Sequence, residues 1–190
     1  MSREVKEVDL NQWFEKGLTK EAYENTLKDH KEGFYKIYET FHLPLNESLF
    51  RNIKEKNLRA IIIAEPWCGH CMLNIPLFLK LQEKIDMPVR FILRDEHTEL
   101  MDQYLTNEKR IIPIFIFIDE SGKEVATWGP MAPYTKQFVD EKRKNLPDKE
   151  SPTYGEAFQT FIQEISAAFT DRADIWQGAY RDIQDTLEQI

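Results

Sequence analysis

The two cysteines of this chain lie three positions apart, in the segment Trp67-Cys68-Gly69-His70-Cys71. Because the 190 residues include only these two cysteines, a disulfide within one chain must join Cys68 to Cys71. If a helix begins at Cys68, Cys71 follows about one turn later, where the two sulfurs can bond, and the helix N-terminus stabilises a thiolate. The spacing therefore predicts a dithiol that is reversibly oxidised and reduced.

The composition narrows the class of protein. The chain carries 25 Lys and Arg against 33 Asp and Glu, a formal net charge of −8, and its positive residues are scattered. We therefore expect no binding to nucleic acid and none to a membrane. The first seven residues are too charged for a signal peptide, and no apolar run is long enough to span a bilayer. These features predict a cytoplasmic protein, in which a lone cysteine pair is more often catalytic, redox-sensing or metal-binding than structural.

The elements around the cysteines follow from apolar patterning. Residues 60–64 form a continuous, β-branched apolar run, which predicts a strand buried on both faces that leads directly into the cysteines. A largely apolar helix follows, and Pro76 within it should kink it. The later expected elements are a strand at 88–93, a helix at 98–105, a strand at 112–118, a turn at 119–122 and an antiparallel strand at 123–128. The βαβα order predicts a parallel sheet with helical crossovers.

Both ends of the chain are predicted to be helical. Asp9 should cap a short helix that stops near Gly17, and Thr19 a longer one whose apolar face extends to Phe41, with Gly33 as an interruption. Residues 46–48 precede a third short helix that runs to about residue 56.

In the tail, Thr153 and Glu156 form a capping-box pattern before two one-sided apolar helices that break near Asp171. We expect the apolar faces of the tail to pack within the chain, and a monomer rather than a dimer. A dimer or partner surface is the alternative.

Four landmarks together resemble the thioredoxin family. They are the apolar strand leading into residues 67–71, Pro76 in the next helix, Ile112-Pro113 at the start of a hairpin, and Gly129 just after it. The resemblance covers about residues 58–145 and implies an α/β protein with the thioredoxin fold, a three-layer α/β/α arrangement around a mixed sheet. The chain would then divide into an N-terminal helical extension packed on the core (1–57), a thioredoxin-like domain (58–145) and a C-terminal helical extension (146–190). The helical lead-in resembles bacterial thioredoxin-like proteins.

The resemblance also implies roles for single residues. Cys68 matches the attacking cysteine and Cys71 the resolving cysteine of a thiol–disulfide oxidoreductase. Pro113 matches a cis-proline beside the disulfide. Ile112 would offer backbone groups to an extended substrate, Trp67 would form an aromatic platform, and Gly129 would leave room in the substrate groove. Such an enzyme exchanges disulfides with proteins or low-molecular-weight thiols, depends on an upstream reductant, and needs no cofactor besides its own cysteines.

Three further positions are expected to tune the site. His70, after Gly69, gives the segment a likeness to protein disulfide isomerases, and a protonated imidazole near Cys68 would lower the pKa of its thiol. The alternative is that His70 is a solvated helix residue. Many family members place a buried carboxylate where this chain has Ile62. Water assisted by Glu65 or His70 is our hypothesis for deprotonating Cys71, although Glu65 also fits a simple polar residue at a strand end.

Two alternatives to an enzyme stay open, a metal-binding protein and a redox-sensing binding protein. Within one chain no metal site is expected, because the remaining histidines show no ligand spacing; they are His30, His42 and His97. A cysteine pair shared across a dimer could still hold a metal or an iron–sulfur cluster. The second alternative to an enzyme is a redox-sensing binding protein, in which the state of the dithiol controls a partner interaction through the added helices.

Overall fold

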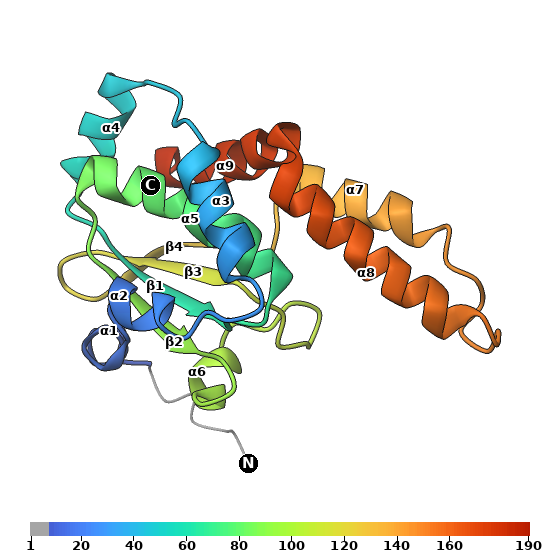
Figure 1. Cartoon of the computed structure of the whole chain (residues 1–190). Coiled ribbons are helices and arrows are strands. Elements are labelled where there is room, and N and C mark those ends of the chain that lie inside the picture. The colour runs from blue at the N-terminus through green and yellow to red at the C-terminus, as the bar shows by residue number, and fades with distance from the viewer. Residues whose placement is uncertain (1–7) are drawn as a thin grey trace, which may run out of the picture.

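The computed structural model describes residues 8–190, and a mixed β-sheet lies at their centre (Figure 1). The strands are ordered β2-β1-β3-β4. Strand β1 is parallel to β2 and antiparallel to β3, and β3 forms an antiparallel hairpin with β4. The strands are β1 (Arg59–Ala64), β2 (Val89–Leu93), β3 (Ile114–Ile118) and β4 (Glu124–Trp128). The sheet is therefore mixed, as the thioredoxin resemblance implied, with β1–β2 as its parallel pair.

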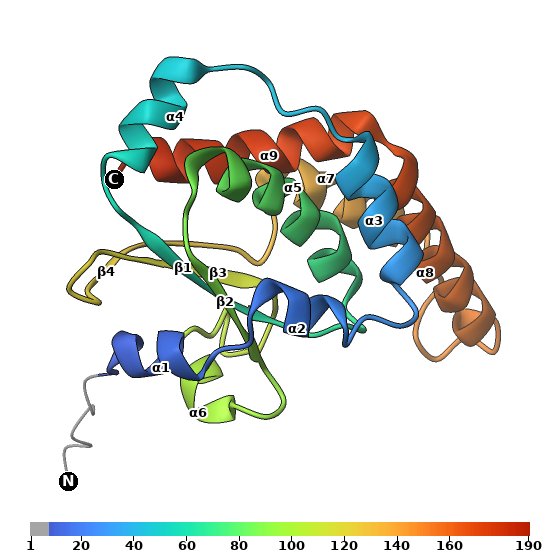
Figure 2. The ribbon, with the colours of Figure 1, turned by 60° about the vertical axis from the view of Figure 1, so that its left-hand side comes forward.

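Helices cover both faces of this sheet. Figures 1 and 2 show α3, α4, α5 and α9 above the sheet and α1 and α6 below it. Strand β3 is buried along its whole length and β1 along nearly all of it, so the continuous apolar runs mark strands covered on both sides. The helices are α1 (Leu10–Lys16), α2 (Lys20–Glu24), α3 (Lys31–Thr40), α4 (Glu47–Lys54), α5 (Gly69–Ile85), α6 (Thr98–Met101), α7 (Pro133–Arg143), α8 (Tyr154–Asp171) and α9 (Ala173–Glu188).

The N-terminal helices are built into the core. Between α1 and α2, Leu18 forms a two-way backbone bridge with Phe91, at N···O distances of 2.8 and 2.9 Å, which covers the free edge of β2. Tyr23 of α2 stacks on the Phe91 ring at 4.4 Å between centroids. Helix α3 packs along α5 and buries Phe34 and Ile37 completely. These helices therefore supply part of the hydrophobic core that supports the sheet.

Several expected elements have different bounds in the structure. The long helix predicted after Thr19 is two helices, because the chain leaves the helical path between α2 and α3, and Gly33 lies inside α3 without interrupting it. The helix predicted at 98–105 ends at Met101. Helix α7 was not predicted, although Pro133 at its first turn is a typical start signal.

The predicted helix caps form at some helices and not at others. Asp9 and Asn46 accept backbone N–H bonds at the starts of α1 and α4, as expected. The side chain of Thr153 makes no capping bond to α8, so the capping-box prediction was wrong. Its hydroxyl instead bonds with that of Ser151, at 2.9 Å.

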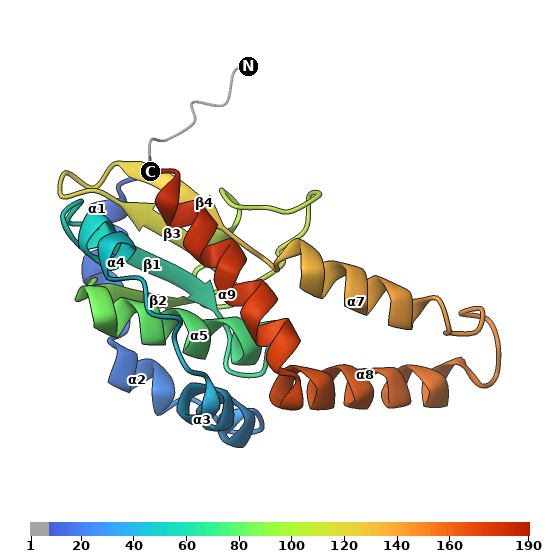
Figure 3. The same ribbon diagram turned by 90° about the horizontal axis from the view of Figure 1, so that it is seen from above.

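The tail forms two helices that meet at Arg172, close to the predicted break. Helix α9 buries its apolar face against α5, α7, α4 and β4. Helix α8 pairs with α7 in a hairpin that projects from the body, as Figure 3 shows. On α8, Phe158 and Ile162 are exposed, so intramolecular packing accounts for only part of the apolar face of the tail.

The boundaries at residues 57 and 145 stay predictions. Residues 1–7, the start of the predicted first segment and the part compared with a signal peptide, lie outside the described residues. Over residues 8–190, no helix is both long and apolar enough to cross a membrane.

We predict that the N-terminal helices are required for stability. Ile37→Ala should lower the free energy of unfolding by about 2–5 kcal/mol, because it leaves a cavity between α3 and α5. The matched control is Ile162→Ala, at a side chain 49% exposed, which should change it by no more than about 0.5 kcal/mol. Urea unfolding followed by circular dichroism measures both. A loss of unfolding free energy in Ile37→Ala as small as that expected for Ile162→Ala would contradict a stabilising role for α3.

Candidate active site

The cysteines sit where β1 leads into α5. Cys68 is the N-cap residue of α5, and its Sγ accepts a hydrogen bond from the backbone N–H of Cys71 at 3.3 Å. The backbone N–H of Cys68 donates to the carbonyl oxygen of Glu65 at 3.2 Å, which fixes the turn before the helix. Both side chains are free thiols, and Cys68 is 8% and Cys71 1% exposed. The Cys68 thiol thus keeps a small exposed area, whereas the Cys71 thiol is almost fully enclosed.

The two thiols differ in acidity. The pKa of Cys68 is lowered, chiefly by a hydrogen bond from the thiol of Cys71. The backbone N–H groups of Cys71 and His70 and the charge of Arg94 add to this effect and outweigh the burial of the thiol. The pKa of Cys71 is raised well above its ordinary value, because that thiol is buried and lies against Cys68. Cys68 is therefore the more acidic thiol of the pair.

The loop before β3 lies against Cys68. The peptide bond between Ile112 and Pro113 is cis, as the resemblance implied, and the thiol of Cys68 donates to the carbonyl oxygen of Ile112, with Sγ···O at 3.7 Å. Gly129 adopts a φ of +129°, and a Cβ there would come within 2.2 Å of the Pro113 carbonyl oxygen. Glycine is thus needed for the close approach of the two backbone segments. A second cis bond, Gly129-Pro130, was not predicted from the sequence.

Trp67 and Gly69 flank the first cysteine. The Trp67 side chain is 51% exposed, and the Arg94 guanidinium lies 4.8 Å from the centroid of its ring. The carbonyl oxygen of Trp67 is hydrogen-bonded to Nε2 of His30 at 3.0 Å. A Cβ at Gly69 would meet nothing within 4 Å, so no steric contact requires a glycine there.

The expectation of a protonated His70 beside Cys68 was wrong. The His70 ring lies 5.0 Å from the ring of Phe169, and its Nδ1 is buried. Burial lowers the pKa of His70 to about 4, and the nearby charge of Arg143 adds to this effect. The imidazole is therefore neutral at pH 7. His70 contributes its backbone N–H to the Cys68 sulfur rather than a charge.

Glu65 is the buried carboxyl group of the site, and it is only 6% exposed. Its Oε1 accepts the backbone N–H of Asp95 at 2.7 Å, and burial raises its pKa. Its charge also raises the pKa of Cys71, so the two groups lie within electrostatic reach of each other. Ile62, the position at which the resemblance implied a carboxylate, is fully buried. Glu65 therefore differs from an ordinary polar residue at a strand end.

Residues that the sequence analysis did not assign complete the site. The buried hydroxyl of Tyr23 donates to the Glu65 carbonyl oxygen at 3.5 Å. Burial raises the pKa of Tyr23, and the two thiols raise it further. Tyr23 and His30 come from the N-terminal helices, and Arg94 follows β2. Only packing brings them together, although a buried tyrosine on an apolar helix face is a weak signal for such a role.

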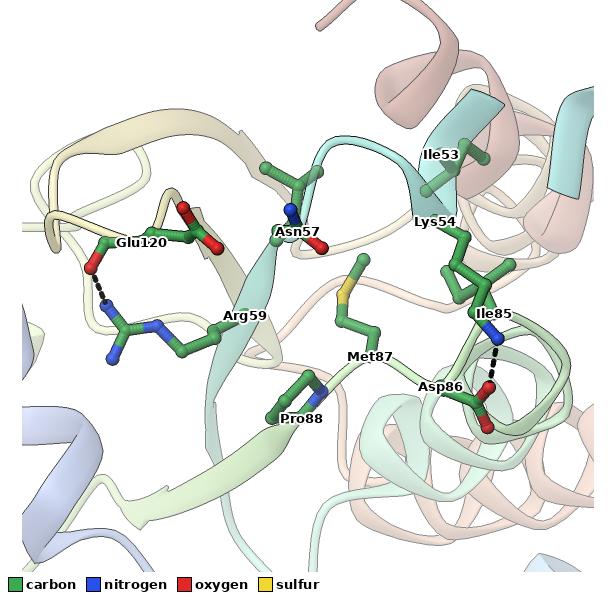
Figure 4. Close-up of a pocket in the computed structure, with 10 residues that line it drawn as sticks. Ile53, Lys54, Asn57, Arg59, Ile85, Asp86, Met87, Pro88 and Glu120 are labelled. Carbon is green, nitrogen blue, oxygen red and sulfur yellow. Dashed lines mark hydrogen bonds and ion pairs between the residues drawn. The ribbon is translucent and has the colours of Figure 1, made fainter. Parts of the chain in front are cut away.

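Other parts of the described chain offer no comparable chemistry. Within residues 8–190, no group of three or more His, Cys, Asp or Glu side chains could hold a metal ion. A cavity of about 470 Å³ lies at the opposite end of β1 from the cysteines (Figure 4). Lys54 forms an ion pair with Asp86, and the Arg59 guanidinium donates to the backbone carbonyl oxygen of Glu120 at 3.3 Å, so these charged groups already have partners. We therefore place the candidate site at the cysteines.

We predict that His70 makes stability depend on pH. Its pKa in the folded protein, about 4, lies below the ordinary value of 6.5, so between these values the unfolded chain binds a proton that the folded protein does not. The contribution to stability is full above pH 6.5 and is lost as the pH falls toward 4, on the order of 2–3 kcal/mol.

Urea unfolding at pH 7 and pH 4.5 tests this dependence. His70→Phe should lose clearly less stability than the wild type over that interval. His42→Phe, at an exposed histidine, should lose as much as the wild type. A His70→Phe protein with the wild-type loss would show that the imidazole is free to ionise in the folded state.

Comparisons with known proteins agree with this architecture. Residues 17–144 match the sequence family described as Thioredoxin, which is more than half of the chain. A crystal structure of a Pseudomonas aeruginosa protein of unknown function is similar, with a TM-score of 0.65 and 16% identity over 96% of this chain and 99% of that one. An HIV epitope scaffold is similar over the same shares, with a TM-score of 0.64 and 16% identity. At these identities the likeness shows the fold.

No protein with a curated description matches the chain. The family match begins at residue 17 and therefore includes most of the N-terminal helices, which pack into the core. It also spans both cysteines, the cis-proline and Gly129. The chain belongs to the thioredoxin family.

Proposed function

We propose that this protein is a thiol–disulfide oxidoreductase that exchanges its Cys68–Cys71 dithiol with the disulfides of proteins or low-molecular-weight thiols. The observation that carries the proposal is the unequal environment of the two thiols. One is stabilised as a thiolate at the N-terminus of α5, and the other is held protonated directly behind it. A structural disulfide needs no such difference, whereas stepwise exchange requires a nucleophile and a reserve thiol.

The exchange proceeds in two steps. The Cys68 thiolate attacks one sulfur of the substrate disulfide, and the other substrate sulfur leaves as a thiolate that takes a proton. Cys71 then loses its proton and attacks Cys68 Sγ, which releases the second substrate thiol. The substrate gains two electrons, the protein keeps a Cys68–Cys71 disulfide, and an upstream thiol reductant restores the dithiol. The cysteines are the redox group, and we expect the protein to act as a monomer.

The lowered pKa of Cys68 also bears on the direction of exchange. Stabilising the thiolate favours the reduced protein, so its disulfide form is a better oxidant than one with an unperturbed cysteine. The effect comes from hydrogen bonds and from Arg94 rather than from a charged imidazole.

Glu65 supports the second step. Its buried carboxyl group is placed to interact electrostatically with Cys71, and its raised pKa suits it to receive a proton at neutral pH. His70 is a poorer base for this purpose, because burial among apolar groups disfavours its protonated form. We propose that Glu65, directly or through water, takes the proton of Cys71.

One contact favours the second candidate function, a redox-sensing binding protein. The ring of His70, next to Cys71, touches Phe169 near the end of α8, and the same helix exposes Phe158 and Ile162 farther along. A change at the dithiol therefore has a packed route to an exposed apolar surface. A measurement of catalytic turnover separates the two functions, because a redox sensor need not return to its dithiol form repeatedly with substrate.

We predict that Glu65→Gln slows the second step. Glutamine can still accept the Asp95 N–H, so the fold is kept, but it cannot take a proton. Release of the mixed disulfide should slow by about 10²-fold at pH 7, the lower end for general base catalysis. Rapid quenching of reduced protein with a peptide disulfide measures the decay of the mixed disulfide. Glu96→Gln, at an exposed carboxylate on the neighbouring loop, is the control, and equal decay in both variants would eliminate Glu65.

The function itself is tested by turnover. The wild type should accelerate the reduction of insulin disulfides by dithiothreitol at pH 7. Cys68→Ser should give only the uncatalysed rate, and Cys71→Ser should accumulate a mixed disulfide on Cys68 that non-reducing electrophoresis detects. A wild-type rate equal to that of dithiothreitol alone, or trapping that does not need Cys68, would contradict the proposal.

A further inference from the structure

A cavity of about 470 Å³ is lined in part by Trp67, the residue that precedes Cys68. One wall is the loop between α2 and α3, and the other is the segment that immediately precedes Cys68. The cavity is lined by Thr26, Lys28, Asp29, Pro66 and Trp67. It is therefore built jointly by the N-terminal helices and the active-site segment.

Both walls are held in place. His30 at the end of the loop is hydrogen-bonded to the Trp67 carbonyl oxygen at 3.0 Å, which joins the two walls directly. Within the loop, the Thr26 hydroxyl donates to the carbonyl oxygen of Tyr23 at 2.6 Å. The Arg94 guanidinium lies 4.8 Å from the centroid of the Trp67 ring and adds a further contact to this wall. The cavity is thus present in the structure without a bound substrate.

The lining suits an apolar side chain. The indole of Trp67 and the ring of Pro66 offer apolar surface, and the Trp67 ring is half exposed. Lys28 and Asp29 lie exposed and carry opposite charges, so together they give the cavity no net charge that would select an ion. Aromatic and aliphatic groups gain most from such a surface, because they remove apolar area from water.

The position of the cavity identifies its occupant. A substrate joined to Cys68 Sγ meets the Ile112 carbonyl oxygen on one side, since that oxygen lies 3.7 Å from the sulfur. Trp67 is the chain neighbour of Cys68 and opens to the cavity. We propose that the cavity is a substrate subsite that binds an apolar side chain next to the reactive cysteine of a polypeptide disulfide. This inference rests on the proposed function and selects polypeptides over low-molecular-weight thiols as substrates.

Two peptide disulfides test the subsite. The probes are the homodimeric disulfides of the end-blocked tripeptides Phe-Cys-Phe and Ser-Cys-Ser, and their rates with the reduced protein are divided by their rates with dithiothreitol. The wild type should prefer the phenylalanine peptide at least about tenfold, the lower end of what an apolar pocket discriminates. Lys28→Trp, which fills the cavity, should cut this preference to about twofold or less. Asp29→Trp blocks it from the next position if the first variant does not fold.

Lys31→Trp is the matched control, with the same loss of charge and the same added bulk three residues away, outside the lining. It should keep the wild-type preference. Equal normalised rates for the two peptides in the wild type would overturn the subsite and leave the proposed function intact. Faster reaction with glutathione disulfide than with the phenylalanine peptide would have the same consequence. An equal loss of preference in Lys31→Trp would also overturn it. No reaction with any disulfide would defeat the proposed function, and the subsite with it.

Discussion

The hydrogen bonds from Cys71 to the sulfur of Cys68 are the interaction on which the rest of the site depends. They form only if Cys68 caps a helix and Cys71 lies in its first turn, so β1, the turn held by the Glu65 carbonyl and α5 must follow without a break. The same contact makes the two thiols unequal in acidity. The Cys71 thiol donates the bond and holds its proton more tightly, while the Cys68 sulfur accepts the bond and is stabilised as a thiolate. In the proposed exchange, the order of attack then follows from this geometry.

The helices before β1 contribute to the cysteine site as well as to the hydrophobic core. Helix α2 places Tyr23 behind the cysteines, and the next loop brings His30 to the Trp67 carbonyl. The backbone bridge between Leu18 and Phe91 ties that segment to the edge of β2. Removing these helices would expose the edge of β2 and take the Tyr23 hydroxyl away from the Glu65 carbonyl oxygen. One region of the chain thereby supports the fold, the turn before Cys68 and one wall of the cavity beside Trp67.

Local sequence patterns predicted the elements that contact the cysteines. They did not predict the environment of side chains whose neighbours are distant in sequence. The apolar run at 60–64, the cysteine spacing and Ile112-Pro113 have strong local signatures, and each led to the correct element. The state of His70 could not be foreseen, because Phe169, nearly a hundred residues later, buries its ring. For the same reason the sequence assigned no role to Tyr23, and it left Glu65 open between a group that assists Cys71 and a polar residue at a strand end. Their roles depend on neighbours that are distant in sequence.

The central claim is that Cys68, and not Cys71, is the cysteine that attacks the substrate disulfide. Alkylation of the reduced protein by iodoacetamide from pH 5 to 9, with each cysteine followed separately by mass spectrometry of proteolytic peptides, measures this most directly. The account predicts that Cys68 is modified with a midpoint below the ordinary thiol pKa of 9.0, while Cys71 in the folded protein stays unmodified throughout. Equal rates at the two cysteines, or faster modification of Cys71, would contradict it.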